Sequence, residues 1–256
     1  MRTFFSEYTS DYTSYTFGYA YYAHIEDYNE LDAAYNGWFL PYTGKLDLTQ
    51  DLFYFCRSLR VDISQFENTS ENRRIIRKVE PLGIQATIYD KDSFDIHDRS
   101  FEEFCIGYTQ SRFYHEGMSP ERFRYVVSRW YANKIIHFTL WETGQTIWYT
   151  LAVVTDTIMH HRFCFFDTEL METIPLGKYL MRWTIDRSKQ QWLEYAYLGT
   201  CYKEAWLYKV RDFQWVQRRD GNKRSTHIEQ LKNLCRSDHE QKYKDLFKID
   251  SWYYLL

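Results

Sequence analysis

The stretch IIHFTLWETGQTIWYTLAVVTDTIMHHRFCFF (residues 135–166) decides the predicted fold. Within it, Ile135–Leu140, Ile147–Val154 and Arg162–Phe166 are short runs rich in β-branched and aromatic residues, which predicts three strands. Thr143-Gly144 is a turn signal between the first two runs. This part of the chain is therefore predicted to be rich in strands.

The neighbouring segments complete a mixed layout. Pro175–Gln191 has apolar residues along one helical face, and Tyr195–Leu198 predicts a further strand. Residues 98–113 and 119–131 are predicted helices, the second opened by the capping sequence Ser119-Pro120. Strand, strand, strand, helix, strand predicts an α/β (α+β) domain with a mixed sheet.

The first part of the chain is less regular. Residues 1–25 are rich in Tyr, Thr and Ser without a clear period, and residues 26–36 predict a short helix ended by Gly37. Residues 52–66 are predicted to be extended. Ser70 is the expected N-cap of a helix that carries several arginines.

Composition limits the classes of function. The 256 residues have a net charge of −3, whereas a dedicated nucleic-acid coat protein would be strongly basic. The 24 Tyr, 18 Phe and 9 Trp suit a core or a stacking surface. We expect no transmembrane helix and no signal peptide, because no long apolar run occurs. Five scattered cysteines indicate reduced thiols in a cytoplasmic protein, and the lack of a long apolar run leads us to expect no membrane partner.

Several common sites are excluded by their missing motifs. No CxxC pair or HExxH predicts a metal, and no phosphate-binding Gly-rich loop or GxSxG elbow predicts a nucleotide enzyme or a serine hydrolase. We therefore expect neither a metal nor a cofactor. The adjacent His160 and His161 would point to opposite faces of a strand, so we expect them on the surface.

Two basic clusters are candidates for contact with RNA. Arg73, Arg74, Arg77 and Lys78 could hold phosphates, although a solvated helix face would look the same. The second cluster interleaves with Trp206, Tyr208, Phe213 and Trp215, which suits a nucleic-acid strand but also an amphipathic strand. Its basic members are Lys209, Arg211, Arg218, Arg219, Lys223 and Arg224.

Nine short segments occur in an order and spacing that resembles the arginyl- and leucyl-tRNA–protein transferases. They are Gly37-Trp38, Cys56–Val61, Phe66–Arg74, the set Tyr108, Arg112, His115 and Met118, then Val154-Thr155-Asp156, Phe165-Phe166-Asp167, Pro175-Leu176-Gly177, Tyr197-Leu198-Gly199 and Tyr208-Lys209. The resemblance covers roughly residues 12–220. It implies an acetyltransferase-like (GNAT) mixed sheet flanked by helices, as in the Fem peptidyl transferases.

The resemblance also implies a domain division and an activity. We expect an N-terminal arginyltransferase-like module over residues 1–95, a GNAT-like transferase domain over 96–222 and a C-terminal helical extension over 223–256. The implied enzyme is an acyltransferase that moves arginine or leucine from aminoacyl-tRNA to the N-terminal α-amine of an acceptor protein, which marks that protein for degradation as an N-degron. The sequence leaves the oligomeric state open.

The matching positions give the candidate site. Asp156 and Asp167 would hold the amine or the donor side chain, and a splay of strands at Tyr197, Leu198 and Gly199 would offer backbone N–H groups to the ester carbonyl. Both aspartates suit turns equally well. The resemblance also implies contacts with acceptor or tRNA for Arg60, Arg73, Arg74, Arg112, Phe166, Gly177, Tyr208 and Lys209.

Departures from the family pattern keep two alternatives open. Phe39-Leu40 follows Gly37-Trp38 in place of two arginines, and only Cys56 remains of four family cysteines. A non-catalytic paralogue that binds tRNA or protein N-termini is one alternative. An acyl-CoA-dependent N-acetyltransferase is the other, disfavoured because Pro175 removes an N–H and Tyr179 is bulky where a pyrophosphate would bind.

Overall fold

The structure is a computed structural model that describes residues 1–13, 15–44, 50–113, 117–221 and 223–240. Its contacts divide the chain into two units, Met1–Ser58 and Leu59–Leu256, which we describe separately. The strands on both sides of residue 70 belong to the second unit because they pair with its other strands. The division expected from the sequence, with an N-terminal module over residues 1–95, stays a proposal.

The first unit is built on a small antiparallel sheet with the order β1-β2-β4-β3. Its elements are β1 (Arg2–Asp11), β2 (Thr16–His24), η1 (Tyr28–Glu30), α1 (Leu31–Asn36), β3 (Phe39–Pro41) and β4 (Leu52–Phe55). Rings line both faces: Phe4 lies near Tyr22, and Phe5 stacks on Tyr21 at 4.4 Å between ring centroids. The aromatic residues that have no clear period in the sequence therefore form a hairpin.

The second unit contains an eight-stranded sheet with the order β12-β11-β5-β10-β9-β8-β7-β6. Its strands are β5 (Ser58–Asp62, beginning at the unit boundary), β6 (Ile84–Asp90), β7 (Lys134–Leu140), β8 (Thr146–Val154), β9 (Ile158–Phe166), β10 (Tyr195–Thr200), β11 (Val216–Asp220) and β12 (Lys223–Ser225). From β6 to β9 the strands are antiparallel, whereas β10 lies parallel to β9. The sheet is therefore mixed, as predicted.

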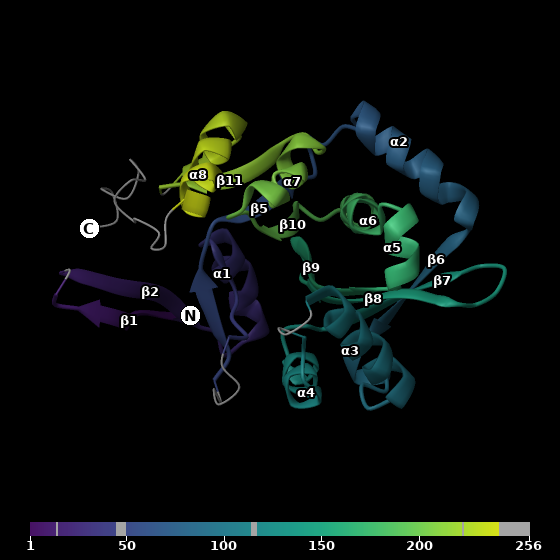
Figure 1. Cartoon of the computed structure of the whole chain (residues 1–256), viewed down its shortest axis with the longest axis horizontal. Helices are drawn as coiled ribbons and strands as arrows, with labels where there is room; N and C mark the ends of the chain where they lie inside the picture. The colour runs from purple at the N-terminus through teal and green to yellow at the C-terminus, as the bar shows by residue number, and fades with distance from the viewer. Residues whose placement is uncertain (14, 45–49, 114–116, 222, 241–256) are drawn as a thin grey trace. The chain divides into compact units, whose positions relative to one another are not determined.

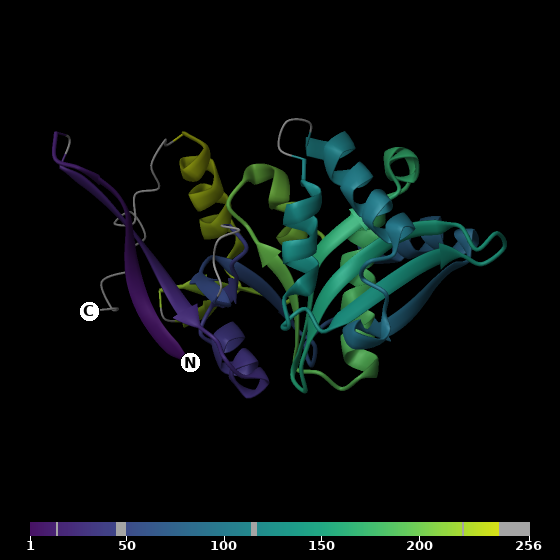
Figure 2. The ribbon, with the colours of Figure 1, turned by 90° about the horizontal axis from the view of Figure 1, so that it is seen from below.

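Helices cover both faces of this sheet. Figure 1 shows α3 and α4 on one face and α5 and α6 on the other, and Figure 2 shows the twist of β6 to β9 between them. The helical elements are α2 (Ser70–Val79), η2 (Glu80–Leu82), η3 (Lys91–Ser93), α3 (Arg99–Phe113), α4 (Pro120–Ser128), α5 (Thr168–Thr173), α6 (Leu176–Gln190), η5 (Glu204–Trp206), α7 (Tyr208–Arg211) and α8 (Ile228–Glu240).

Two buried clusters hold these layers together. One lies under α6 on β7 and β8 and includes Phe138, Trp148 and Leu180, whose rings and side chains are fully buried. The other joins β5, β10 and β11 to α7 and α8, and includes Leu198, Val210 and Leu231. Burial of side chains of this size stabilises the fold by roughly 1.5–3 kcal/mol each.

The predicted fold class, an α/β sheet flanked by helices, is confirmed. The helices predicted at 98–113 and 119–131 are present as α3 and α4, and Gly37 caps α1. The cap of α2 is Thr69, one residue before the expected Ser70, because Thr69 and Asn72 bond each other's backbone in a capping box. The last residues, 241–256, lie outside the described part of the chain.

Within the described residues, we find no helix whose length and apolar character would let it cross a membrane. The longest helices, α3 and α6, have 15 residues each and carry charged side chains. A membrane-spanning helix needs about 20 predominantly apolar residues.

The end of α6 provides a test of backbone strain. Trp192 follows the cap Gln191 with φ 59°, and Leu193 N–H donates to Ser188 O, which is the arrangement that favours glycine. The Trp192 side chain is 92% exposed, so it gains little from packing.

We expect Trp192→Gly to raise the free energy of unfolding by about 1 kcal/mol and the melting temperature by roughly 2–4 °C. The reason is that glycine has no Cβ, which is the atom that disfavours a left-handed backbone. Trp141→Gly is the matched control, since Trp141 is 68% exposed without a positive φ. Thermal unfolding followed by circular dichroism measures both. Equal destabilisation of the two variants would contradict this account of Trp192.

Candidate functional site

The candidate site lies where β9 and β10 separate. The two strands pair in parallel from Tyr195↔Ile158 to Tyr197↔His160. Among these residues, all of them described, the pairing of β9 with β10 stops there, although β10 runs on to Thr200 and β9 to Phe166. On its other side β9 stays paired with β8 as far as Phe166. The second half of β9 therefore has one open edge.

Lys209 enters this opening from α7. Its Nζ donates to the carbonyl oxygen of Leu198 at 2.9 Å and to that of Thr200 at 3.1 Å. Carbonyls two residues apart on a strand point to the same edge. The ammonium therefore supplies β10 with the hydrogen bonds that a neighbouring strand would otherwise give. Between them, Gly199 has φ 77°, and a Cβ there would lie 3.6 Å from Nζ.

The surroundings of Lys209 carry little negative charge. Burial lowers the pKa of its ammonium, while the thiols of Cys201 and Cys164 act weakly in the opposite direction. Among the described residues, no carboxylate contributes to this shift. A partly buried ammonium on whose pKa no carboxylate of the described residues acts is suited to stabilise negative charge that arrives with a substrate or develops during a reaction.

The two histidines of β9 also lie by this opening. His160 is 1% exposed, so the expectation that it lies on the surface is wrong; the strand is central in its sheet and both of its faces are covered. Burial lowers the pKa of His160 well below its usual value, and burial and the charge of Lys209 lower that of His161 to about 3. Both imidazoles are therefore neutral at pH 7.

A cavity of about 270 Å³ opens along the free edge of β9. It is lined by the consecutive residues Arg162, Phe163, Cys164 and Phe165, and across from them by Tyr108, Thr109, Phe113 and Met118. Successive side chains of a strand point to opposite faces. A cavity lined by four in a row must therefore lie against the strand's edge, which is the edge that β10 leaves.

The lining of this cavity is mostly aromatic and neutral. Burial raises the pKa of the Tyr108 hydroxyl and of the Cys164 thiol to about 12 each, so both stay protonated at pH 7. The Thr109 hydroxyl donates to Ile106 O and accepts from Met118 N, both at 2.9 Å. Of the described lining residues, Arg162 carries the charge.

Tyr197 and Arg60 form a polar cluster on the sheet, away from the Leu198 side chain. Arg60 Nη1 donates to the Tyr197 hydroxyl at 3.3 Å, and its guanidinium lies 3.4 Å above the centre of the Tyr195 ring. Arg60 Nε also donates to Gln217 Oε1 at 2.9 Å. Leu198, one residue on, packs into the opposite, apolar cluster. Tyr197 is therefore the last residue of β10 that pairs with β9, and Arg60 fixes its side chain.

The two candidate aspartates lie at opposite ends of β9. Asp156 is exposed in the turn before the strand. Asp167 follows the strand and caps α5, with Oδ1 accepting from Leu170 N at 3.0 Å. The nine residues between β9's ends span roughly 30 Å. The structure therefore does not bring these two carboxylates together, and Asp167 is the one at the end near the cavity.

The remaining candidates fall into two groups. Tyr208, Phe166 and Arg112 lie near Tyr108, which lines the cavity. The ring centroids of Phe166 and Tyr108 are 5.8 Å apart, and the charges of Arg112 and Tyr208 act on the Tyr108 pKa. Gly177 is in the first turn of α6 with open space beside it. Arg73 and Arg74 are on the exposed face of α2, where Arg74 pairs with Glu71 at 2.7 Å and lowers the pKa of that carboxyl to about 2.

Sequence reasoning did not select Cys164, Tyr108 or Phe163 as site residues. Cys164 and Phe163 belong to the run Arg162–Phe166, whose aromatic residues looked like the ordinary core of a strand. Tyr108 was matched to the family pattern but was not selected as a site residue. These residues line the cavity because β9 and β10 stop pairing. No local sequence pattern predicts where that pairing stops.

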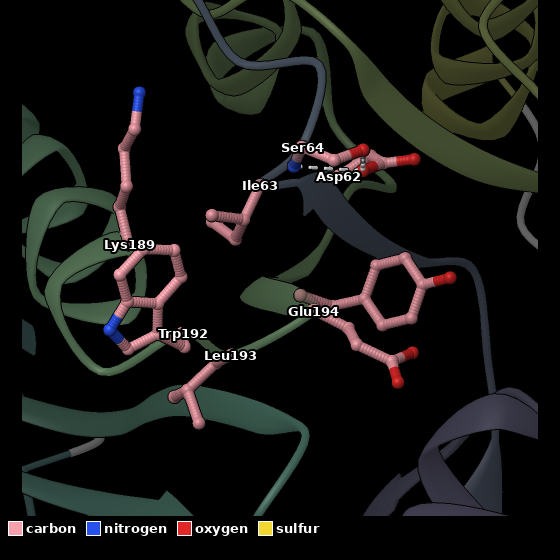
Figure 3. Close-up of a pocket in the computed structure, with 8 residues that line it drawn as sticks. Asp62, Ile63, Ser64, Lys189, Trp192, Leu193 and Glu194 are labelled. Carbon is pink, nitrogen blue, oxygen red and sulfur yellow. Dashed lines mark hydrogen bonds between the residues drawn. The ribbon is translucent and has the colours of Figure 1, made fainter.

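A second hollow of about 590 Å³ lies at the other end of β10 (Figure 3). Asp62, Ile63 and Ser64 line it from the end of β5, while Lys189 and Trp192–Tyr195 line it from the end of α6 and the start of β10. It contains none of the residues that the sequence predicted for the site. We therefore place the candidate site at the splay.

Comparisons with known proteins give matches in structure alone. No family model matches the chain, and no curated protein matches it. A C-terminal domain (DUF2156) of a putative lysylphosphatidylglycerol synthetase from Agrobacterium fabrum is similar over 70% of this chain and 53% of its own, with 11% identity and a TM-score of 0.42. L-PGS from Bacillus licheniformis is similar over 75% and 59%, with 12% identity and a TM-score of 0.40. The chain thus spans little more than half of either.

The buried histidine predicts a loss of stability in acid. Unfolding frees His161 to bind a proton at its ordinary pKa near 6.5, whereas the folded chain resists protonation down to about pH 3. The unfolded state therefore binds more protons between these values, so stability falls as the pH drops through 6.5.

Between pH 7 and pH 5 the free energy of unfolding should fall by about 2 kcal/mol less in His161→Gln than in the wild type. His97→Gln, at an exposed position, should leave the loss unchanged. Urea unfolding at the two pH values measures it. An equal loss in the wild type and in His161→Gln would show that this imidazole is not buried.

Proposed function

We propose that this protein is an aminoacyl-tRNA-dependent transferase that moves an aminoacyl group to the N-terminal α-amine of an acceptor protein. The observation that carries the proposal is the open edge between β9 and β10. The partly buried Lys209 ammonium lies in this opening, and its charge acts on Cys164, which lines the cavity along the edge. The order of family-like segments along the chain supports the same activity.

The reaction requires positioning more than strong acid or base catalysis. The α-amine of the acceptor attacks the ester carbonyl, the bond to the ribose oxygen breaks, and the amine's proton leaves with that oxygen. An α-amine with a pKa of about 7.7–8.0 is already partly neutral at pH 7. The ester is activated before it arrives, so holding the two groups together supplies much of the rate.

Lys209 is the residue that we assign to charge stabilisation. Two of its three N–H groups bond the carbonyls of Leu198 and Thr200, which fixes the ammonium in the splay. The third can reach an oxygen that becomes negative when the amine adds to the ester. Because Lys209 is partly withdrawn from solvent, that interaction is stronger than it would be in water. This role replaces the contact with tRNA or an acidic residue that the sequence suggested for Lys209.

Direct attack by the acceptor amine fits the site better than a covalent intermediate. Cys164 is the thiol that lines the cavity, and a pKa of about 12 keeps it protonated. The thiolate is the nucleophilic form of cysteine. The donor and the acceptor would therefore have to be bound together before reaction.

The tRNA would bind through the second unit. Residues 1–58 hold three of the 32 Lys and Arg but eight of the 35 Asp and Glu, so the first unit repels phosphate. On α2, Arg73 and Arg77 border a hollow of about 330 Å³. Arg74 is bound to Glu71 in the same helix, so we assign the phosphate contact to Arg73 and Arg77.

The cavity favours leucine over arginine as the donated residue. Its described lining has four aromatic rings, Met118 and the cation Arg162. A guanidinium side chain would lose its hydration there and meet a like charge. An apolar side chain would instead bury its surface, at roughly 25 cal/mol per Å².

The start of α6 argues against an acyl-CoA donor. Pro175 occupies the cap and has no N–H, and the N–H of Leu176 already donates to Ile174 O at 2.8 Å. Lys178 is paired with Asp212 at 2.6 Å and Glu71 at 3.3 Å. A pyrophosphate cradle at a helix N-terminus needs such groups to face the ligand.

The transfer itself is the first test. Labelled leucyl- and arginyl-tRNA are incubated with peptides that begin with Asp, Glu, Arg or Lys, and with vesicles of phosphatidylglycerol as the other acceptor. We expect label in a peptide. Lys209→Met should lower the rate by about 100-fold, as expected when one stabilising donor is lost. Lys203→Met, an exposed lysine nearby, should change it little.

Label found only in lipid would contradict the protein acceptor. With folded wild-type protein, no transfer from any donor to any acceptor would favour the non-catalytic paralogue.

The choice of donor is a separate prediction. We expect leucyl-tRNA to react at least ten times faster than arginyl-tRNA. The leucyl side chain gains free energy by burial in the cavity, whereas the arginyl guanidinium would meet the like charge of Arg162. Arg162→Gln should lower the ratio of the leucyl rate to the arginyl rate, whereas Arg122→Gln on α4 should leave that ratio unchanged. Competition between the two labelled donors in one reaction measures the ratio. Faster transfer of arginine would contradict the assignment of the cavity to an apolar side chain.

A further inference from the structure

Two cysteines at the edge of the site lie in contact inside the core. Cys201 directly follows β10, and Cys235 is on α8. Both are 0% exposed, and their Sγ atoms are 3.8 Å apart. The Sγ of Cys235 also lies 3.7 Å from the carbonyl oxygen of Cys201. A disulfide bond is about 2.05 Å long, so the sulfurs would need to approach by only about 1.8 Å.

The other thiols have different surroundings. Cys56 Sγ lies 3.7 Å from Trp38 O in the first unit, Cys105 is buried on α3, and Cys164 lines the cavity. Cys201 and Cys235 have their sulfurs in contact. This contact makes the pair the candidate for an intramolecular disulfide.

The pair lies where it can influence the splay. The carbonyl oxygen of Thr200, the residue before Cys201, accepts a hydrogen bond from Lys209 Nζ. On α8, Arg236 Nε already bonds Glu204 Oε1 at 2.9 Å in the segment between β10 and α7. A covalent bond at the adjacent Cys235 would fix α8 to the strand end that holds Lys209.

We propose that Cys201 and Cys235 form a reversible disulfide, a modification site that locks α8 onto the end of β10. Hydrogen peroxide is the oxidant class that is small enough to reach these sulfurs. One thiol attacks peroxide oxygen, forming a sulfenic acid and releasing water; the second thiol then displaces the hydroxyl as water. The two sulfurs lose two electrons in total, and the peroxide gains them. This proposal does not depend on the transferase activity.

The oxidant must enter through local opening, because both sulfurs are buried. α8 is the last described helix, and its side chains Leu231 and Cys235 reach the core. Its other partners in the described chain include an exposed pair, Arg236 and Glu204. Helices that are attached by few buried side chains open at lower free energy than the core. Oxidation is therefore expected to be slow and to follow the opening of α8.

The test uses the full-length protein with and without hydrogen peroxide. After free thiols are blocked, non-reducing digestion and mass spectrometry should find peptides with Cys201 and Cys235 joined and lighter by two hydrogens. Oxidation should raise the melting temperature by about 5 °C or more and slow amide exchange in α8 at least tenfold. Dithiothreitol should reverse all three changes.

The controls separate the pair from general oxidation. Cys235→Ser should abolish the cross-link and the changes in melting temperature and amide exchange. Cys105→Ser should retain them. Cys235→Ala replaces Cys235→Ser if the serine variant does not fold. A cross-link between chains, sulfinic acid at either position without a cross-link, or a cross-link that leaves exchange in α8 unchanged would overturn the proposal. The mass analysis of the wild type stands without any variant.

Discussion

The bonds from Lys209 to the carbonyls of Leu198 and Thr200 are the constraint on which the proposed site depends. A strand that leaves its neighbour exposes carbonyl groups, and a buried carbonyl without a donor costs about 1–3 kcal/mol. The ammonium meets that requirement for two carbonyls at once. In this way the fold keeps β9 and β10 apart and places a positive charge in the opening, so the structural bond and the proposed catalytic charge belong to one side chain.

The groups near that charge are consistently neutral. His160 and His161 have lowered pKa values, and Cys164 and Tyr108 have raised ones, each because burial disfavours the charged form. An environment of this kind leaves Lys209 as the group that responds to an incoming negative oxygen. It also explains why a thiol beside the cavity is not assigned as a nucleophile. The physical picture is a lysine ammonium among neutral histidine, cysteine and tyrosine side chains, with Arg162 in the cavity lining, and not a chain of acids and bases.

Much of the fold could be predicted from the sequence, and less of the site. The strands from Ile135 to Phe166 and the helix ending near Gln191 have strong periodic patterns, and the structure confirms them. The hairpin of β1 and β2 was not predicted, since its rings lie on both faces and hide the alternation. Asp156 and Asp167 are close in sequence yet lie at opposite ends of β9, and Cys201 and Cys235 are distant in sequence yet in contact. Such relations depend on tertiary pairing.

The central claim is that the cavity along the free edge of β9 holds the aminoacyl end of a donor beside Lys209. A crystal structure with a stable amide analogue of 3′-leucyl-adenosine tests it most directly. We predict the leucyl side chain among Tyr108, Phe163 and Cys164, and the carbonyl oxygen within hydrogen-bond distance of Lys209 Nζ. An analogue bound in the hollow beside Trp192, or in neither place at saturating concentration, would contradict the account.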